Sequence, residues 1–255
     1  MISKNTHSLT VLTGASKGMG LAIAQQLLTP GDTLLCISRT SSDALAVDAE
    51  KAGTTLVQWT HDLADAASSS LQLEQWLEGQ SRHVWASVTL INNAGMIPPI
   101  APLGAIKAAE IARALRVGLE APMQLSSAFL RATENWRTPR KVLNISSGLG
   151  RRAMASQAGY CAAKAGMDHF SRCVALEEAL KPNGASVCSL APGVIDTGMQ
   201  EQLRSANSNA FPDQASFLNL KTSGSLSSPE DAARRILAFL ARTDFGSNPV
   251  ADIRD

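Results

Sequence analysis

The residues of this sequence best suited to acid–base chemistry are Tyr160 and Lys164, in the segment Tyr160-Cys-Ala-Ala-Lys164. Tyr160 is the only tyrosine among the 255 residues. Positions i and i+4 share one face of a helix, so the lysine ammonium is expected near the phenol oxygen. A free phenol has a pKa of about 10, and a neighbouring cation favours its ionised form. The sequence therefore predicts a phenol with a lowered pKa that exchanges protons with a ligand.

A layered α/β scaffold is predicted to position this pair. Short apolar runs alternate with stretches of helical periodicity, which is typical of a parallel sheet covered by helices on both faces. The apolar runs are 9–14, 33–38, 54–59, 85–95, 141–147 and 185–193, and the helical stretches are 18–28, 65–78, 104–131, 157–180 and 229–242. We expect one doubly wound domain over residues 1–255, with ligands bound beyond the carboxyl ends of the strands.

A glycine-rich turn follows the first apolar run, in Thr13-Gly-Ala-Ser-Lys-Gly-Met-Gly20. Its glycines permit a tight turn and the approach of a phosphate, and the next helix offers free N–H groups and the positive end of its dipole. The turn is predicted to bind the pyrophosphate of a dinucleotide, although glycine-rich turns also serve as plain connections. The residues concerned are Gly14, Ser16, Lys17, Gly18, Met19 and Gly20.

The same turn also fits the G-x-S-x-G nucleophile elbow of α/β hydrolases, with Ser16 as nucleophile. An elbow needs an oxyanion loop from an earlier strand, and only about a dozen residues precede this turn. The sequence therefore favours dinucleotide binding over ester hydrolysis.

The end of the second apolar run indicates which dinucleotide binds. An acid there would accept hydrogen bonds from the ribose of NAD, whereas an arginine suits the additional phosphate of NADP. This run ends in Ser38-Arg39, with no acid, and Lys17 supplies a second cation from the glycine turn. Guanidinium–phosphate contacts are bidentate and strong, so we predict NADP(H) as the cofactor.

These motifs together resemble the short-chain dehydrogenases/reductases. Thr13-Gly14-x-x-x-Gly18-x-Gly20 matches the cofactor motif of that family, and Ser147 precedes Tyr160 by the usual 13 positions. The resemblance covers nearly the whole chain and implies a Rossmann-type fold with a parallel sheet of about seven strands. It further implies cofactor contacts from segments after the third, fourth and sixth strands. These are Asp62, Leu63, Asn93, Ala94, Gly95, Pro192, Gly193, Ile195 and Thr197.

The resemblance also implies a division of roles among the catalytic residues in carbonyl reduction by NADPH. Tyr160 exchanges the proton, Lys164 assists it and holds the nicotinamide ribose, and Ser147 binds the substrate oxygen. A structural alternative remains, because Asp168 lies four residues after Lys164 and an ion pair between them would occupy the lysine.

One position departs from the family pattern. Relatives usually carry an asparagine three positions before the alanine of the Ala-Pro step, where it anchors a water that relays protons to the lysine. This chain reads Val117-Gly118-Leu-Glu-Ala121-Pro122. Either the relay survives in altered form, or activity is impaired, or the alignment slips by one residue. The second hypothesis is therefore an NADP(H)-binding protein with little or no turnover.

The region predicted to contact the substrate is inferred from the length and composition of one segment and from the resemblance to the family. Residues 194–227 mix apolar with polar residues at a length typical of a lid, with a plain surface loop as the alternative. Within the family, the chain looks most like sepiapterin and benzil reductases. Met199 and Asp252 are the tentative substrate residues, with a solvated tail as the alternative for Asp252. A small ketone, a diketone and a pterin all remain possible substrates.

The bulk composition narrows the range of partners. A formal net charge of +1 with scattered basic residues excludes the charge pattern of a nucleic-acid binder. No apolar run approaches a membrane span, and no histidine or cysteine spacing indicates a metal site. We expect a cytoplasmic protein, and the resemblance implies a homodimer or homotetramer.

Overall fold

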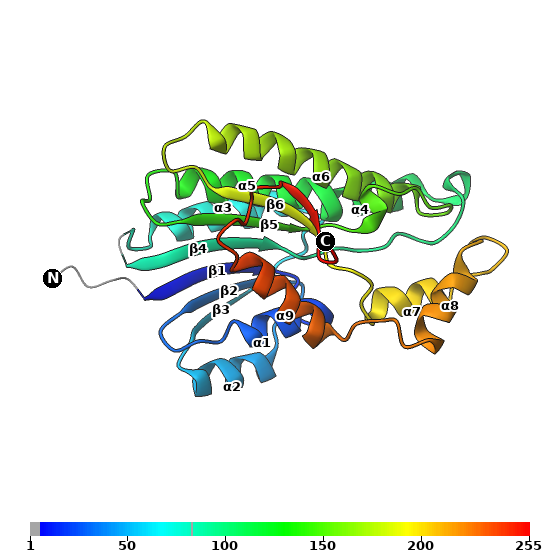
Figure 1. The fold of residues 1–255 in the computed structure, drawn as a ribbon, viewed down its shortest axis with the longest axis horizontal. Coiled ribbons are helices and arrows are strands. Elements are labelled where there is room, and N and C mark those ends of the chain that lie inside the picture. The colour runs from blue at the N-terminus through cyan, green and yellow to red at the C-terminus, as the bar shows by residue number, and fades with distance from the viewer. Residues whose placement is uncertain (1–5, 83) are drawn as a thin grey trace.

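The fold is built on one parallel sheet. The computed structural model describes residues 6–82 and 84–255. Within them, seven strands pair in the order β3-β2-β1-β4-β5-β6-β7 (Figure 1). The strands are β1 His7–Thr13, β2 Thr33–Ser38, β3 Thr55–Thr60, β4 Trp85–Asn92, β5 Arg140–Ile145, β6 Ser186–Ala191 and β7 Val250–Asp252. Every predicted apolar run overlaps a strand, and the short C-terminal strand completes the sheet. The doubly wound Rossmann-type α/β fold class is thus confirmed.

Helices cover both faces of the sheet (Figure 1). One apolar cluster joins α1, α2 and α9 to the sheet, and a second joins α3, α5 and α6 to the opposite face. The long helices are α1 Gly18–Gln26, α2 Asp43–Ala52, α3 Ala66–Glu78, α4 Ala108–Leu115, α5 Ala121–Ala132, α6 Ala158–Ala179, α7 Gly198–Arg204, α8 Gln214–Thr222 and α9 Pro229–Leu240. No helix in the described ranges is long and apolar enough to cross a membrane.

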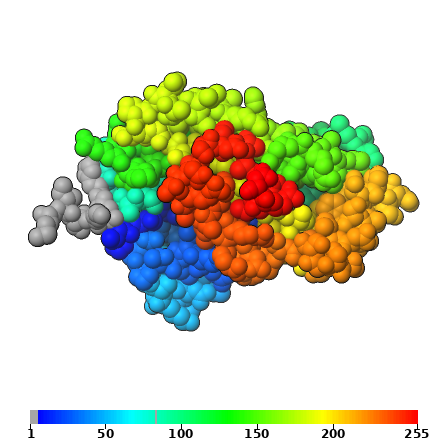
Figure 2. All heavy atoms as spheres, viewed as in Figure 1, coloured from blue at the N-terminus to red at the C-terminus, as the bar shows by residue number. Residues whose placement is uncertain are grey.

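Three helical regions differ from the sequence expectation. The stretch 104–131 is not one helix, because a 3-10 turn η1 (Leu103–Ala105) precedes α4 and a π-helical turn η2 (Arg116–Glu120) separates α4 from α5. Helix α2 was not predicted, and it begins where the Ser42 hydroxyl accepts from the backbone N–H of Leu45 at 3.3 Å. The segment 194–227 contains α7 and α8, and it forms the yellow-to-orange projection in Figure 2.

A buried polar network fixes β4 and β5 to the helices above them. The Nδ2 of Asn92 donates to Asn144 Oδ1 at 2.8 Å and to Ser126 Oγ on α5 at 3.1 Å. Asn144 in turn donates to Ser171 Oγ on α6 at 2.9 Å. Because buried amides are destabilising without such partners, the network fixes the register of β5 against α6. The strand end and the helix that carry the catalytic candidates are thereby aligned.

Candidate active site

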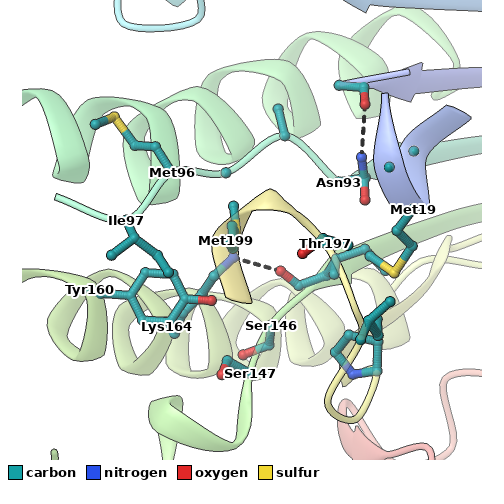
Figure 3. A pocket seen from close by; sticks show the side chains of 18 of the residues that line it. Met19, Asn93, Met96, Ile97, Ser146, Ser147, Tyr160, Lys164, Thr197 and Met199 are labelled. Carbon is teal, nitrogen blue, oxygen red and sulfur yellow. Dashed lines mark hydrogen bonds between the residues drawn. The ribbon is translucent and has the colours of Figure 1, made fainter. Parts of the chain in front are cut away.

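One large cavity lies at the carboxyl ends of the strands. Its volume is about 1010 Å³, and every residue that the sequence predicted for cofactor, catalysis or substrate lines it. Figure 3 shows Tyr160, Lys164, Ser146 and Ser147 on one side of this cavity, with Met19 and Asn93 on the other. This is the position expected for ligands of a doubly wound sheet.

The glycine turn is held by backbone contacts. Gly14 has a φ of 73°, which favours glycine, and a Cβ on Gly20 would lie 2.0 Å from the Gly14 carbonyl oxygen. The Asn93 Nδ2 donates to the Thr13 carbonyl oxygen at 2.9 Å, and the Ala94 N–H donates to Thr13 Oγ1 at 2.9 Å. Asn93 and Ala94 thus fix the shape of the turn.

The start of α1 fits an anion. Its N-cap is Lys17, and no side chain of the described residues caps the helix there. The first N–H groups and the positive end of the helix dipole are therefore free to bind negative charge beside the cavity. The residues present fit a dinucleotide pyrophosphate.

Ser38 and Arg39 lie at the end of β2 and have different roles. The Ser38 hydroxyl accepts from the Ala15 N–H at 2.8 Å and so holds the glycine turn against β2. Arg39 lines the cavity and is exposed, as is Lys17. Both predicted cations thus border the cavity on the same side as the glycine turn.

Asp62 has partners that the sequence did not indicate. It accepts from the Ala64 N–H at 3.0 Å and pairs with Arg113 of α4 at 2.8 Å. The hydrogen bond from Ala64, followed by the charges of Arg113 and Arg39, lowers the pKa of the Asp62 carboxyl. Its role as an adenine contact stays a prediction.

The three catalytic candidates come from two elements. Ser147 follows β5 and caps the short turn η3 (Gly148–Gly150), accepting from the Leu149 N–H at 3.2 Å. Tyr160 and Lys164 lie one turn apart on α6, and the Lys164 Nζ lies 5.8 Å from the centroid of the tyrosine ring. The lysine ammonium donates to the Ile145 carbonyl oxygen at 2.7 Å. The end of β5 therefore fixes both the serine and the lysine.

The pKa of Tyr160 is shifted in the direction opposite to the predicted one, because burial outweighs the effects that lower it. Burial raises the pKa of Tyr160, and hydrogen bonding with Ser147 opposes this rise only in part. The ammonium is directed at Ile145 O instead of the phenol oxygen. Burial also lowers the pKa of Lys164 to about 8, while the negative charge of Asp168 acts against this fall. Tyr160 is thus a protonated acid at neutral pH.

Asp168 is bound by partners other than Lys164. Its carboxylate accepts from Ser146 Oγ at 2.6 Å and from Ser189 Oγ at 2.7 Å, and it lies 3.4 Å from Arg151 Nε. The side chain is 2% exposed. The alternative in which a direct ion pair occupies the lysine is therefore wrong, and Asp168 acts on Lys164 through its charge alone.

The substrate side of the cavity has an apolar wall. Tyr160 and Met199 pack against a cluster in which the rings of Phe211 and Phe217 stack with centroids 5.5 Å apart. Ile97 belongs to the same apolar cluster, and Figure 3 shows it beside Tyr160. The segment 194–227 thus covers the tyrosine with apolar side chains.

Asp252 is not a solvated tail residue. It lies in β7, is 9% exposed and pairs with Arg254 at 2.6 Å. The hydrogen bond from Arg254 is the largest of the effects that lower the pKa of the Asp252 carboxyl. Its charge is therefore already balanced at the edge of the cavity.

Comparison with known proteins decides the family. Residues 8–208 match the family model of the short chain dehydrogenases. The chain belongs to the short-chain dehydrogenase family. It is 34% identical over 243 residues to the benzil reductase ((S)-benzoin forming) of Bacillus cereus, with 95% of this chain and 98% of the relative covered. It is 30% identical over 263 residues to the sepiapterin reductase of Xenopus laevis, with 97% and 95% covered.

A solved structure agrees with this assignment. A protein from Beutenbergia cavernae, described as an NAD(P)-dependent gluconate 5-dehydrogenase with bound NADP, has a TM-score of 0.80 and 27% identity. The match covers 96% of this chain and 94% of that one. Membership of the short-chain dehydrogenase family makes this chain an oxidoreductase of carbonyl chemistry.

The unusual Gly118 of this short-chain dehydrogenase has a packing reason. It lies in the π-helical turn η2, where a Cβ would lie 3.0 Å from the Ala163 Cβ on α6. A π-turn shifts the backbone hydrogen bonds of a helix and is frequent at functional sites. Glycine thus permits close contact of η2 with the helix turn that carries Lys164.

Sequence reasoning missed several residues that line the cavity of this short-chain dehydrogenase. Arg113, Gln157 and Gln200 all line it, as do Arg151 and Arg254. Gln157 had a signal, since it precedes Tyr160 by three positions and so shares its helix face. Arg113 had none, because its partner Asp62 lies in a separate element, whereas Arg254 pairs with Asp252 only two positions away.

Proposed function

We propose that this chain is an NADPH-dependent carbonyl reductase that acts on a small ketone, diketone or pterin-like substrate. The observation that carries the proposal is the meeting of Ser147, Tyr160 and Lys164 with the glycine turn in one cavity. An acid, a hydroxyl donor and a buried cation beside a dinucleotide site form the set that carbonyl reduction needs.

NADP(H) is the proposed cofactor. Arg39 and Lys17 provide positive charge for the additional phosphate, and the uncapped start of α1 accommodates the pyrophosphate. The NADP held by the Beutenbergia relative supports this choice. When bound, NADPH would supply the hydride. Gly95 and Lys164 line the inner part of the cavity, where the nicotinamide end is proposed to lie.

Tyr160 is the proposed proton donor. Since burial raises its pKa, the phenol is protonated at neutral pH and is ready to donate to a carbonyl oxygen that gains negative charge. Ser147 lies beside it and donates a hydrogen bond to the same oxygen. The buried ammonium of Lys164 stabilises the phenolate left after proton transfer. The three groups thus act on one substrate oxygen.

An apolar aromatic diketone is the best-supported substrate class. The wall around Tyr160 is formed by Met199, Phe217 and their apolar neighbours, and the Asp252 carboxylate is already paired with Arg254. The benzil reductase relatives act on such a diketone by name, whereas the sepiapterin reductases act on a pterin. We also propose that the segment 194–227 acts as the substrate lid.

A homodimer or homotetramer is proposed for the assembly. Leu176 on α6 and Leu180 at its C-cap lie four positions apart and are 72% and 88% exposed. Exposed leucines on one helix face support burial against another subunit. Light scattering coupled to gel filtration gives the mass in solution, and a monomer would contradict this part of the proposal.

The test of the activity is a substrate panel. The purified protein is mixed with NADPH or NADH and with benzil, a simple aldehyde or sepiapterin, and cofactor oxidation is followed at about 340 nm, where reduced nicotinamide absorbs. We expect oxidation of NADPH, fastest with benzil. Tight NADPH binding without oxidation by any carbonyl would instead support the binding protein without turnover. Ester cleavage that depends on Ser16 would revive the hydrolase hypothesis.

A further inference from the structure

Gln157 is a buried amide with unused hydrogen-bonding capacity. It is the N-cap residue of α6, is 1% exposed and lines the cavity. Neither its Oε1 nor its Nε2 has a hydrogen-bond partner among the described residues. Because both atoms are unpartnered, exchanging the oxygen and nitrogen in the side chain leaves this observation unchanged. An unpaired buried amide destabilises a fold, so its presence needs a reason.

Gln157 stands at the start of the helix that carries the proposed proton donor. Gln157 and Tyr160 are three positions apart, and residues at i and i+3 are neighbours on one helix face. Helical side chains lean toward the N-terminus, so the tyrosine ring leans over the turn that contains Gln157. The surroundings are otherwise apolar, with Met154, Phe211 and Phe217 in the adjoining cluster.

Other unpartnered polar atoms do not share this position. The Nε1 atom of Trp136 belongs to a residue that does not line the cavity. Gln200 on α7 lines the cavity, and its buried Oε1 has no partner among the described residues. Of the three residues, Gln157 is the one at the start of α6 and the one whose two amide atoms are both buried and unpartnered.

We propose that Gln157 is a specificity residue that binds the second oxygen of a vicinal dicarbonyl substrate. The reacting oxygen faces Tyr160 and Ser147, and the Nε2–H of Gln157 donates to the oxygen of the neighbouring carbonyl. This inference rests on the proposed reductase activity. It adds the chemical class of substrate for which the site is built, two adjacent carbonyl groups.

The reaction leaves this contact intact. One C=O bond becomes a CH–OH group, with the hydride supplied by the cofactor and the proton by Tyr160. The second C=O bond is unchanged, so the hydrogen bond from Gln157 persists from substrate to hydroxyketone product. Both amide atoms are covered in the structure, so the proposed contact requires the side chain of Gln157 to change its torsions when the substrate binds.

The experiment compares two substrates that differ by one oxygen. Benzil has two adjacent carbonyls between phenyl rings, and deoxybenzoin has the same skeleton with one. The Gln157→Met variant keeps an unbranched side chain of similar length without the amide. We expect the ratio of kcat/KM for benzil to that for deoxybenzoin to fall about tenfold, the effect of one lost hydrogen bond. Gln200→Met is the matched control and should keep the ratio.

A second readout does not depend on turnover. Isothermal titration of benzil and of deoxybenzoin into the NADP⁺-loaded protein should show the same tenfold selective loss for benzil in Gln157→Met. This arm separates failure of the reductase proposal, in which NADPH is not oxidised, from failure of the Gln157 proposal. Equal losses for the two compounds in both assays would overturn the role of Gln157.

Thermal unfolding excludes a structural role for the amide. Replacing an unpaired buried amide with an apolar side chain should leave Tm equal to or above that of the wild type. A clear fall in Tm would mean that the amide has a partner within the folded protein, and the proposal would be wrong.

Discussion

The two halves of the cavity are built in different ways. At the glycine turn, contacts are made by backbone atoms and by short polar side chains such as Thr13 and Asn93. On the substrate side, Phe211 and Phe217 provide apolar cover, while Gln157 keeps an unpaired amide. Backbone contacts at van der Waals distance tolerate little change, whereas a side-chain wall can be repacked. The cofactor half should therefore be rigid and the substrate half adjustable.

The rigidity of the cofactor half is tested most strongly at Gly20. In Gly20→Ala, a Cβ would lie 2.0 Å from Gly14 O, so the turn must move. We expect the free energy of unfolding to fall by about 1–3 kcal/mol and NADPH binding to weaken by about 100-fold. Chemical denaturation and fluorescence titration of NADPH measure these effects. Gly104→Ala is the control, since a Cβ there meets no atom within 4 Å, and similar losses in both variants would contradict the rigid turn.

The choice of cofactor is tested at Arg39. Removing the guanidinium in Arg39→Ala should raise the Kd for NADPH by about 10- to 100-fold, because a charge-assisted contact to phosphate is lost. The Kd for NADH should change far less. Lys51→Ala on α2 serves as a control for net charge. Equal weakening of both cofactors would show that Arg39 does not read the additional phosphate.

The fall of activity at high pH, the alkaline limb of the pH profile, is tested at Asp168. This residue is bound by Ser146 and Ser189. Because the pKa of Lys164 is about 8, its ammonium is lost as the pH rises through that value, and reduction should fall above it. The negative charge of Asp168 raises this pKa, so Asp168→Asn should shift the limb to lower pH. A pH profile of kcat/KM for benzil reduction measures the shift.

A matched control for this shift lies on the same helix. Glu178 is also 2% exposed, but it pairs with Arg140 and Lys181 away from the cavity. Glu178→Gln should destabilise the fold, because the buried guanidinium loses its partner, while the limb stays in place. If the alkaline limb moves equally in Asp168→Asn and Glu178→Gln, the shift results from destabilisation of the fold and not from the charge of Asp168.

The smallest effect is expected at Arg254 in the adjustable half. Its side chain is 62% exposed, so its pair with Asp252 contributes less than about 1 kcal/mol to stability. Arg254→Ala should leave NADPH affinity unchanged and free the carboxylate to accept from a pterin. The ratio of sepiapterin to benzil turnover should rise by about two- to fivefold. No change in this ratio would remove Asp252 from the substrate site.

The difference between the halves also explains what the sequence could predict. The glycine turn, Arg39 and the Ser147–Tyr160–Lys164 set depend on short spacings within one or two elements, and the structure brings all of them into one cavity. The direction of the Tyr160 pKa was not predictable, because burial and the hydrogen bond from Lys164 to Ile145 depend on packing. Spacing shows which groups are near, but not which atom a cation binds.

Contacts between distant segments account for the other gaps. The pairing of Asp62 with Arg113 joins residues 51 positions apart, and the hydrogen bond from Ser146 to Asp168 joins residues 22 apart. Helix α2 was not predicted, although Ser42 and Gly53 mark its ends and Leu45 and Ala49 are buried one turn apart. Helix-capping residues can be recognised in a sequence, whereas an ion pair between two elements can be identified only when the fold is known.

The most direct test of the account is the Tyr160→Phe variant, which removes one oxygen atom and keeps the ring. With benzil and saturating NADPH, we expect kcat to fall by about 1,000-fold, as for loss of a general acid. The Kd for NADPH should stay within about twofold of the wild-type value, because the glycine turn is unchanged. Turnover that remains within about twofold of wild type would contradict the assignment of Tyr160 as the proton donor.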